Sequence, residues 1–264
     1  MAWIKEFSGI SNTSVTNTLQ VTVPAGGVAA GHFLVLGIAS SGTGTPTWSV
    51  TDTRSNTWTS NLKDEITTTG NTGAMVTCVV SITLQAGDII TLTSTTGTVD
   101  RIAACFEEFD DTVTAIDTSS SNDNGGASGS ALTSGNFTTT QNSELLVGVL
   151  NMVSIGRVFT ATSPWTAGTK IATSSGSGDR AVVVMWQIVS TTGTYAATGT
   201  FNSSALYSFL GAGFKTSAVV SRTGKAKVWN GSSWESHPAK VWNGSAWVDH
   251  PMKAWDGSSW TLGK

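Results

Sequence analysis

The chain has 264 residues, enough for a large buried core, and only 12% of them are charged. Its net charge of −3 argues against nucleic acid as the main partner. No apolar run reaches the length of a membrane-spanning helix, so membrane insertion is not expected. Residues 1–7 lack the basic and then apolar pattern of a signal peptide, which predicts assembly in the cytosol.

The predicted elements are strands, because Ser, Thr and Gly are abundant and apolar residues alternate with polar ones or form short runs. Helical periodicity is missing. We expect an all-β protein with the following strands, separated by turn-forming residues: Ala2–Phe7, Thr18–Val23, Phe33–Ala39, Trp48–Asp52, Ala74–Ile82, Ile89–Ser94, Arg101–Phe109, Leu145–Met152, Ala181–Val189, Tyr195–Phe201 and Leu206–Phe214.

Residues 1–218 are predicted to form one antiparallel β-sandwich. Ser119–Ser134 consists mainly of Ser, Asn, Gly and Ala, which predicts a long loop or crossing segment. Three sequence blocks recur in the same order at offsets of about 105 to 112 residues, so two similar halves are expected, about 1–118 and 135–216. The simplest architecture is a jelly-roll-like sandwich whose halves each supply strands to both sheets; two small sandwiches joined by the Ser-rich stretch are the alternative.

The C-terminal part repeats with a period of 13 residues, as Lys227–Trp234, Lys240–Trp247 and Lys253–Trp260. The pairs Asn-Gly and Asp-Gly are preferred at the centre of a two-residue type I′ turn. Residues 227–264 are therefore predicted to form a tandem array of three short β-hairpins, after a linker at 219–226. His237-Pro238 and His250-Pro251 are expected between hairpins, where proline ends strand pairing.

The sequence offers little catalytic chemistry, so an enzyme is not expected. The three histidines, His32, His237 and His250, form no Ser-His-Asp set with other residues. Cys78 and Cys105 lie in apolar strands, which predicts buried, reduced side chains rather than a zinc site. We expect no metal and no cofactor.

Two groups of acidic residues have structural explanations. The cluster formed by Glu107, Glu108, Asp110 and Asp111 could supply paired carboxylates, but neighbouring strand residues point to opposite faces. A strand end that runs into a solvated turn is the preferred interpretation. A second group, Asp52, Asn56 and Asp64, could ligate calcium, although its spacing matches no defined calcium loop and a turn built by Asp and Asn side chains is favoured.

Several segments resemble known virion proteins. Phe33–Ala39, Val50–Trp58, Gly87–Thr93 and Phe106–Phe109 resemble a β-sandwich domain of phage structural proteins and some bacterial surface proteins. The family usually has a Gly-Asn-Thr-aromatic turn, where this chain has Ser55, and often a Gly where this chain has Asp110. The Lys-x-Trp-Asn-Gly-Ser-x-Trp array resembles short repeats at the ends of minor tail and other virion proteins of actinobacterial phages.

This resemblance implies a virion structural protein, a minor tail or fibre-like component that is made in the host cytoplasm. Its expected partners are other virion proteins, further copies of itself in a homotrimer, and glycans of the host envelope. A capsid-surface decoration protein and a carbohydrate-binding module are the alternatives.

The tryptophans fall into two groups. Four are expected in the core or at its rim: Trp48, Trp58, Trp165 and Trp186. The candidate assembly or glycan-binding residues are the six tryptophans of the array: Trp229, Trp234, Trp242, Trp247, Trp255 and Trp260.

Overall fold

The computed structural model divides into two compact units, Met1–Ser217 and Ala218–Lys264. The residues that it describes are 1–11, 17–43, 46–66, 69–111, 113–123, 129–153, 155–174, 179–216, 225–229, 231–238, 240–249, 253–255 and 260–262. Within these ranges all regular structure is β, which confirms the all-β prediction. No helix in the described part of the chain is long and apolar enough to cross a membrane.

The first half of the larger unit forms two sheets. Sheet 1 has the strand order β2-β7-β4, and sheet 2 has the order β1-β8-β3-β6-β5. The bounds are β1 Trp3–Ser11, β2 Thr18–Thr22, β3 Phe33–Thr43, β4 Trp48–Asp52, β5 Trp58–Ile66, β6 Asn71–Val79, β7 Ile89–Ser94 and β8 Thr98–Phe109.

The second half forms two further sheets. Sheet 3 has the order β14-β16-β12-β19-β9, with β15 also paired to β16, and sheet 4 has the order β10-β18-β13; β11 and β17 form a separate pair. The bounds are β9 Val113–Asp123, β10 Gly129–Thr133, β11 Phe137–Thr138, β12 Glu144–Met152, β13 Phe159–Ala161, β14 Thr166–Ala167, β15 Ile171–Ala172, β16 Ala181–Val189, β17 Thr194–Tyr195, β18 Thr198–Ala205 and β19 Tyr207–Thr216.

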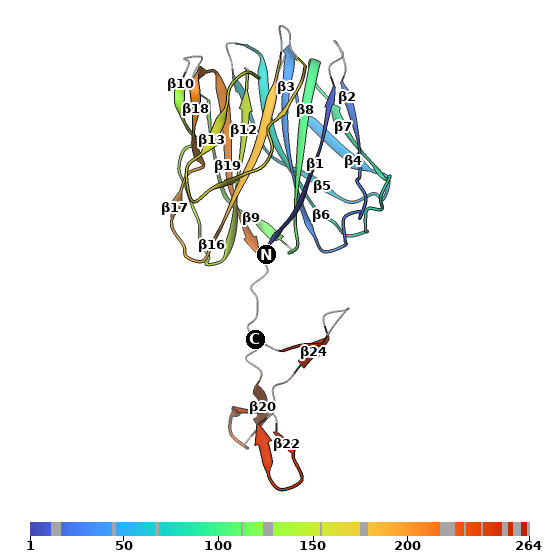
Figure 1. The fold of residues 1–264 in the computed structure, drawn as a ribbon, viewed down its shortest axis with the longest axis vertical. Helices are drawn as coiled ribbons and strands as arrows, with labels where there is room; N and C mark the ends of the chain where they lie inside the picture. Colours follow the sequence, from blue (N-terminus) through green and yellow to red (C-terminus); the bar gives the residue numbers. More distant parts are fainter. Residues whose placement is uncertain are drawn as a thin grey trace. The chain divides into compact units, whose positions relative to one another are not determined.

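The four sheets stack as layers in numerical order, with one apolar core between each pair of neighbours. Leu34 and Leu36 pack toward sheet 1, whereas Phe33 and Val35 on the same strand pack toward sheet 3. The third core lies between sheets 3 and 4 and includes Leu146 and Phe201. Figure 1 shows the layers from β10 and β18 on the left to β2 and β4 on the right. Central strands such as β3 are apolar on both faces because both faces are covered.

The strand order corrects the predicted arrangement of the halves. No described strand of residues 1–109 shares a sheet with a strand of residues 113–216, so the halves do not supply strands to common sheets as in the expected jelly roll. Each half is a sandwich of its own, and the two are joined through the core between sheets 2 and 3. The halves nevertheless belong to one compact unit. The side chains of the core that they share are as fully buried as those of the outer cores.

The two halves have matching topology. The order β1-β8-β3-β6-β5 in sheet 2 corresponds to β9-β19-β12-β16 followed by β14 and β15 in sheet 3, and β2-β7-β4 corresponds to β10-β18-β13. The pairing registers also agree, since Phe33 faces Phe109 in one half and Leu145 faces Phe214 in the other.

The Ser-rich stretch Ser119–Ser134 is not a loop, but it does pass from one sheet to another, as the alternative of a crossing segment predicted. Its described residues lie largely in β9, which pairs with β19 along the edge of sheet 3, and in β10, which belongs to sheet 4. The prediction missed these strands because it required an apolar face. As an edge strand, β9 is held by its backbone pairing with β19, and its side chains at 115–123 are exposed or only partly buried, so the strand needs no apolar face.

Gly37 marks a close approach of the two central sheets. A Cβ atom at this position would lie 2.7 Å from Val184 Cγ2 and 3.0 Å from Val149 Cγ1, both in sheet 3. Real carbon atoms do not approach so closely, so any larger residue would force the sheets apart. Glycine is therefore required here by packing rather than by backbone conformation.

In its described residues the smaller unit contains three two-stranded antiparallel pairs, which confirms the predicted hairpin array. The bounds are β20 Lys225–Trp229, β21 Trp234–Pro238, β22 Lys240–Trp242, β23 Trp247–Asp249, β24 Lys253–Trp255 and β25 Trp260–Leu262. The first hairpin begins at Lys225, inside the expected linker 219–226, whose residues 219–224 lie outside the described residues. The prediction that His237-Pro238 lies between hairpins is wrong, because both residues belong to β21 and pair with Ala226 and Lys225. His250-Pro251 lies outside the described residues.

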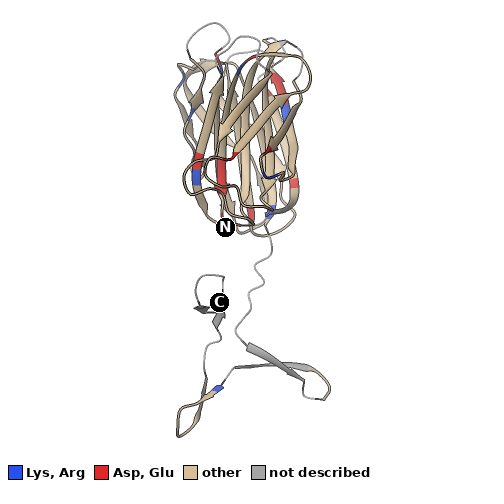
Figure 2. Cartoon of the chain, turned by 90° about the vertical axis from the view of Figure 1, so that its right-hand side faces the viewer, with Lys and Arg blue, Asp and Glu red and all other residues tan. Residues whose placement is uncertain are grey.

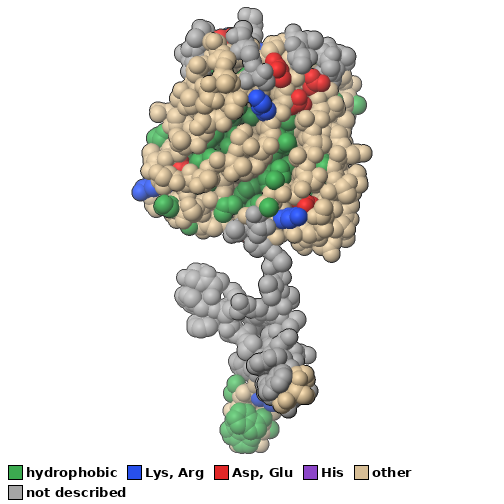
Figure 3. Space-filling view, turned by 180° about the vertical axis from the view of Figure 1, so that it is seen from behind, with side chains coloured by type: hydrophobic (Ala, Val, Ile, Leu, Met, Phe, Trp, Pro, Cys, Tyr) green, Lys and Arg blue, Asp and Glu red, His purple; other side chains and the backbone are tan. Residues whose placement is uncertain are grey.

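The surface of the larger unit is sparsely charged, and Figure 2 shows long stretches of strand without Lys, Arg, Asp or Glu. On the face shown in Figure 3, hydrophobic side chains form a band between polar ones. A groove of about 320 Å³ lies between β5 and β6 on one side and β9 and β19 on the other, with Val79, Val113, Ile116 and Phe214 in its wall.

Candidate functional site

The tip of the second hairpin differs from the predicted type I′ turn. In the second hairpin, Trp242 pairs with Trp247, and the Asn243 amide donates to the Ala246 carbonyl at 3.0 Å, so Gly244 and Ser245 form the tip. Gly244 has a φ of 101°, a conformation that favours glycine. The Asn243 Oδ1 atom accepts hydrogen bonds from the amides of Ser245 and Ala246, both at 2.9 Å. Asn243 thus caps the turn with its side chain instead of occupying its centre.

The two tryptophans of this hairpin remain largely exposed. Trp242 is 52% and Trp247 is 64% exposed, although their rings contact each other at a centroid distance of 5.8 Å. Such a pair is a large apolar surface on a very small element. The other four candidate residues occupy equivalent register positions, since Trp229 pairs with Trp234 and Trp255 with Trp260; their side chains lie outside the described residues.

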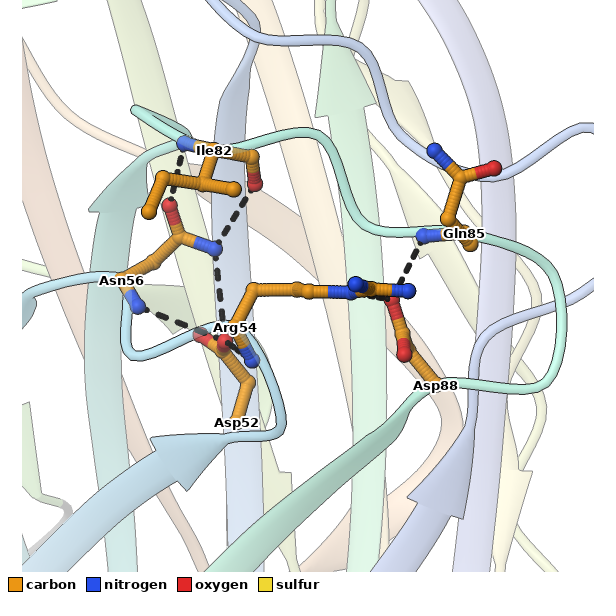
Figure 4. A network of polar contacts seen from close by, with 6 residues as sticks. All are labelled: Asp52, Arg54, Asn56, Ile82, Gln85 and Asp88. Carbon is orange, nitrogen blue, oxygen red and sulfur yellow. Dashed lines mark hydrogen bonds and ion pairs between the residues drawn. The ribbon is translucent and has the colours of Figure 1, made fainter.

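The acidic group around Asp52 forms a turn, as the favoured interpretation predicts. Asp52 Oδ1 accepts from the Arg54 amide at 2.8 Å, and Asp52 Oδ2 accepts from Trp58 Nε1 at 2.7 Å. Asn56 Oδ1 accepts from the Ile82 amide at 2.8 Å and so ties this turn to the next loop (Figure 4). Asp64 lies apart on β5, and burial raises its pKa. These three residues therefore do not converge on one ligand.

Ser55, inside this turn, has a φ of 62°, which is a left-handed conformation that side chains other than glycine rarely adopt. This is the position at which the resembling family usually has Gly. The loop keeps the conformation because neighbouring contacts hold it, including the pairing of Arg54 Nε with Asp88 Oδ2 at 2.7 Å (Figure 4).

The prediction for Glu107 and Glu108 is wrong, because both side chains are buried rather than solvated. They do point to opposite faces of β8. Glu108 Oε2 forms an ion pair with Lys5 Nζ at 3.3 Å, and Glu108 Oε1 lies 2.6 Å from His32 Nδ1. Glu107 points instead toward sheet 3. Both are buried because each face of β8 is covered at this point, by Lys5 and His32 over Glu108 and by the connection at Gly168 over Glu107.

Glu107 belongs to a carboxyl pair that the sequence did not reveal. Glu6 lies directly opposite Glu107 in the pairing of β1 with β8. Burial, and then the neighbouring Glu6, raise the pKa of Glu107 to about 9, so Glu107 keeps its proton at neutral pH and donates it to Glu6. Glu107 Oε2 also accepts from Trp3 Nε1 at 2.5 Å. Both oxygens of Glu107 therefore lie close to a hydrogen-bond donor, Trp3 Nε1 for Oε2 and the Cys105 thiol for Oε1.

The pair is closed from the other side by the connection between β14 and β15. The Thr169 amide donates to Glu6 Oε2 at 2.6 Å. A Cβ atom on Gly168 would lie only 2.1 Å from Glu107 Oε1, so glycine alone leaves room for the carboxyl groups. Cys105 Sγ lies 3.9 Å from the same oxygen, and with Glu6 and Glu107 it forms the one group of potential metal ligands among the described residues. These contacts link the two sandwiches.

Glu144 is a second buried carboxyl group that sequence reasoning missed. Burial, and then a hydrogen bond with Asp117, raise its pKa to about 7. Desolvation raises the pKa of Asp117, but hydrogen bonds from Lys215 and Thr140 lower it by more, and the resulting pKa is about 2. Lys215 Nζ lies 2.7 Å from Asp117 Oδ1. A single acidic residue at the start of an apolar strand was the only signal in the sequence.

The cysteines and the tryptophans of the sandwiches lie in the cores or pack against them. Cys78 and Cys105 are free and buried, as predicted, in cores on opposite faces of sheet 2. Trp48 and Trp165 are buried, and Trp58 and Trp186 are partly buried against the cores. His32 contacts Glu108, the side chain of His237 lies outside the described residues, and so does His250.

Comparison with known proteins found no relative. No family model, curated protein or solved structure matches the chain.

Proposed function

We propose that the chain is a non-enzymatic structural component of a bacteriophage particle, a minor tail or fibre-like protein, in which the hairpin array is the assembly element. The observation that supports this most is the exposure of Trp242 and Trp247, at 52% and 64%, on one hairpin. Water around two large aromatic rings is unfavourable, and a partner that covers them gains about 25 cal/mol for each Å² buried. The repeat places two such residues in each of three hairpins.

The use of the buried carboxyl groups favours a structural role over a catalytic one. Glycoside hydrolysis needs two carboxyl groups about 5 Å or more apart, with the substrate between them. Glu6 and Glu107 instead hydrogen-bond each other, and the Thr169 amide and the Trp3 indole take further positions on them. The pair is thus occupied in joining the two sandwiches.

Self-assembly is tested by light scattering of the full chain, whose monomer mass is 27.3 kDa. We expect the mass of a trimer. Replacing Trp229, Trp242 and Trp255 together with Ala should return the chain to a monomer, while the circular dichroism of the sandwiches stays unchanged. Replacing Lys227, Lys240 and Lys253 with Gln is the matched control, since it alters the same strands and leaves the aromatic rings in place.

A monomeric wild-type chain, or a trimer that survives the tryptophan replacements, would contradict the assembly role. Glycan binding by the array would then be the favoured alternative. The position on the particle is tested separately by immuno-electron microscopy of purified phage particles. Label on the tail supports the minor tail assignment, label on the head favours the capsid-decoration alternative, and unlabelled particles contradict the virion proposal.

A further inference from the structure

A surface groove of about 450 Å³ opens where the two sandwiches meet, at the edge that carries β1 and β14. Its wall contains Trp3, Glu6, Thr166, Gly168, Thr169 and Trp186. It therefore combines two indole rings with a carboxyl group and with backbone from the β14–β15 connection. No other groove described above has this mixture of flat aromatic surface and polar groups.

Trp3 supplies the exposed part of the aromatic surface. It is 43% exposed and stacks on Trp186 with a centroid distance of 5.6 Å and an interplanar angle of 6°. Trp186 in turn packs edge to face against the buried Phe109, at 5.9 Å. The three rings form a series from the surface into the core, so the outer ring rests on a rigid support.

The Trp3 ring is also fixed in rotation. Its Nε1–H donates to Glu107 Oε2 at 2.5 Å, and Glu107 is wholly buried. An exposed tryptophan whose orientation is held by a buried carboxyl group is pre-organised, because it loses little side-chain entropy when a ligand stacks on it. A tryptophan that served only the core would be expected to bury its ring.

The polar side of the groove selects the charge of a ligand. Glu6 forms part of the wall and is held by the Thr169 amide at 2.6 Å. Carboxyl oxygens accept hydrogen bonds from hydroxyl groups but disfavour anions. A flat ring surface beside such acceptors suits a molecule with one apolar C–H face and hydroxyl groups at its rim, which is the chemistry of a pyranose sugar.

We propose that the Trp3–Trp186 groove binds a pyranose unit of an uncharged saccharide, which stacks on Trp3 and donates hydroxyl hydrogen bonds to Glu6. This site lies in the larger unit, and the inference does not depend on the assembly role of the hairpin array. It assigns saccharide binding to the sandwiches rather than to the tryptophans of the repeats.

The test uses the full chain and three uncharged probes, maltohexaose, cellohexaose and chitohexaose. Binding is followed by saturation-transfer NMR of the sugar and by the indole N–H resonances of the protein. The Trp3 resonance is identified by its loss in Trp3→Phe. We expect at least one probe to bind, to shift the Trp3 resonance, and to bind equally well at low and high salt, because no net charge is exchanged.

Trp3→Ala should weaken binding by roughly tenfold or more, which corresponds to about 1.4 kcal/mol, because it removes the ring on which the sugar stacks. Glu6→Gln keeps an acceptor in place and should weaken it less. The double variant Trp242→Ala/Trp247→Ala is the matched control and should bind as wild type does. The thermal unfolding of each variant is recorded, so that a loss of fold is not taken for a loss of binding.

Three outcomes would overturn the proposal. The first is that none of the probes binds to the wild-type chain. The second is that a folded Trp3→Ala variant binds as tightly as wild type. The third is that binding is lost only in the Trp242/Trp247 variant, which would place the sugar on the repeats. Binding of tetramethylammonium in place of the sugars, weakened by salt, would identify a cation site instead.

Discussion

Glu6 and Glu107 lie directly opposite each other on β1 and β8, and their carboxyl groups share a hydrogen bond in the space between the two sandwiches. Two carboxyl groups can share such a site only while one of them keeps its proton. The contact between the sandwiches is therefore linked to pH, and it also fixes the ring of Trp3.

The free energy of unfolding should fall as the pH rises from about 7 to about 8.5. The pKa of Glu107 is about 9 in the folded chain and near its ordinary value of 4.5 when unfolded, so over this range only the folded state holds the proton. Stability contributed by this group is complete below pH 4.5 and is lost as the pH approaches 9, by at most about 1.4 kcal/mol per pH unit. Urea unfolding at a series of pH values measures the slope.

Glu107→Gln should flatten this slope, because its amide makes similar hydrogen bonds without titrating. Glu144→Gln is the matched control: the pKa of Glu144 is about 7, so this variant should change the slope mainly between about pH 4.5 and 7. An unchanged slope above pH 7 in Glu107→Gln would show that Glu107 is already ionised there.

Ser55→Gly should stabilise the larger unit by about 0.5–1 kcal/mol. The φ of 62° at Ser55 costs a residue with a Cβ atom about 1–2 kcal/mol, and the greater freedom of glycine in the unfolded chain offsets part of this gain. Ser49→Gly, on the exposed face of β4, is the control and should destabilise. Denaturant midpoints of the two variants should move in opposite directions, and a shift of both to lower denaturant would contradict the prediction.

Gly168→Ala should destabilise the larger unit by about 1–3 kcal/mol. The new methyl group would lie 2.1 Å from Glu107 Oε1 and 2.6 Å from Glu6 Oε2, so the carboxyl pair or the β14–β15 connection must move. Gly156→Ala is the control, since a Cβ atom there meets nothing within 4 Å. The midpoint temperatures of thermal unfolding of the two variants are compared with that of the wild type. In the background of Glu107→Ala the cost of Gly168→Ala should shrink, and an equal cost would mean that the clash lies elsewhere.

Asn243→Ala should loosen the second hairpin by about 1–2 kcal/mol. Its side-chain oxygen accepts hydrogen bonds from the Ser245 and Ala246 amides and from Ser245 Oγ, and alanine offers no replacement. The ring-current shifts that Trp242 and Trp247 impose on each other in the NMR spectrum should decrease. Asn243→Asp keeps the acceptor and should preserve the shifts. Shifts that persist in Asn243→Ala would show that ring contact alone holds the hairpin.

The sequence by itself determined the elements that depend on local patterns. Apolar runs such as Phe33–Ala39 predicted central strands, and the spacing of Trp242 and Trp247 around Asn-Gly predicted a hairpin, because strand and turn propensities act over a few residues. The Ser-rich edge strand β9 escaped the prediction, since its place depends on pairing with β19 rather than on its own pattern.

Only the tertiary structure decided how the halves combine and which acids are buried. The same strands could form shared or separate sheets, and the choice rests on packing across sheets, such as Gly37 against Val184, that joins residues far apart in the chain. Glu6 and Glu107 are 101 positions apart in sequence and meet only through the pairing of β1 with β8. Whether a carboxyl group is buried depends on the strands and loops that pack over it, and the sequence around that group does not specify them.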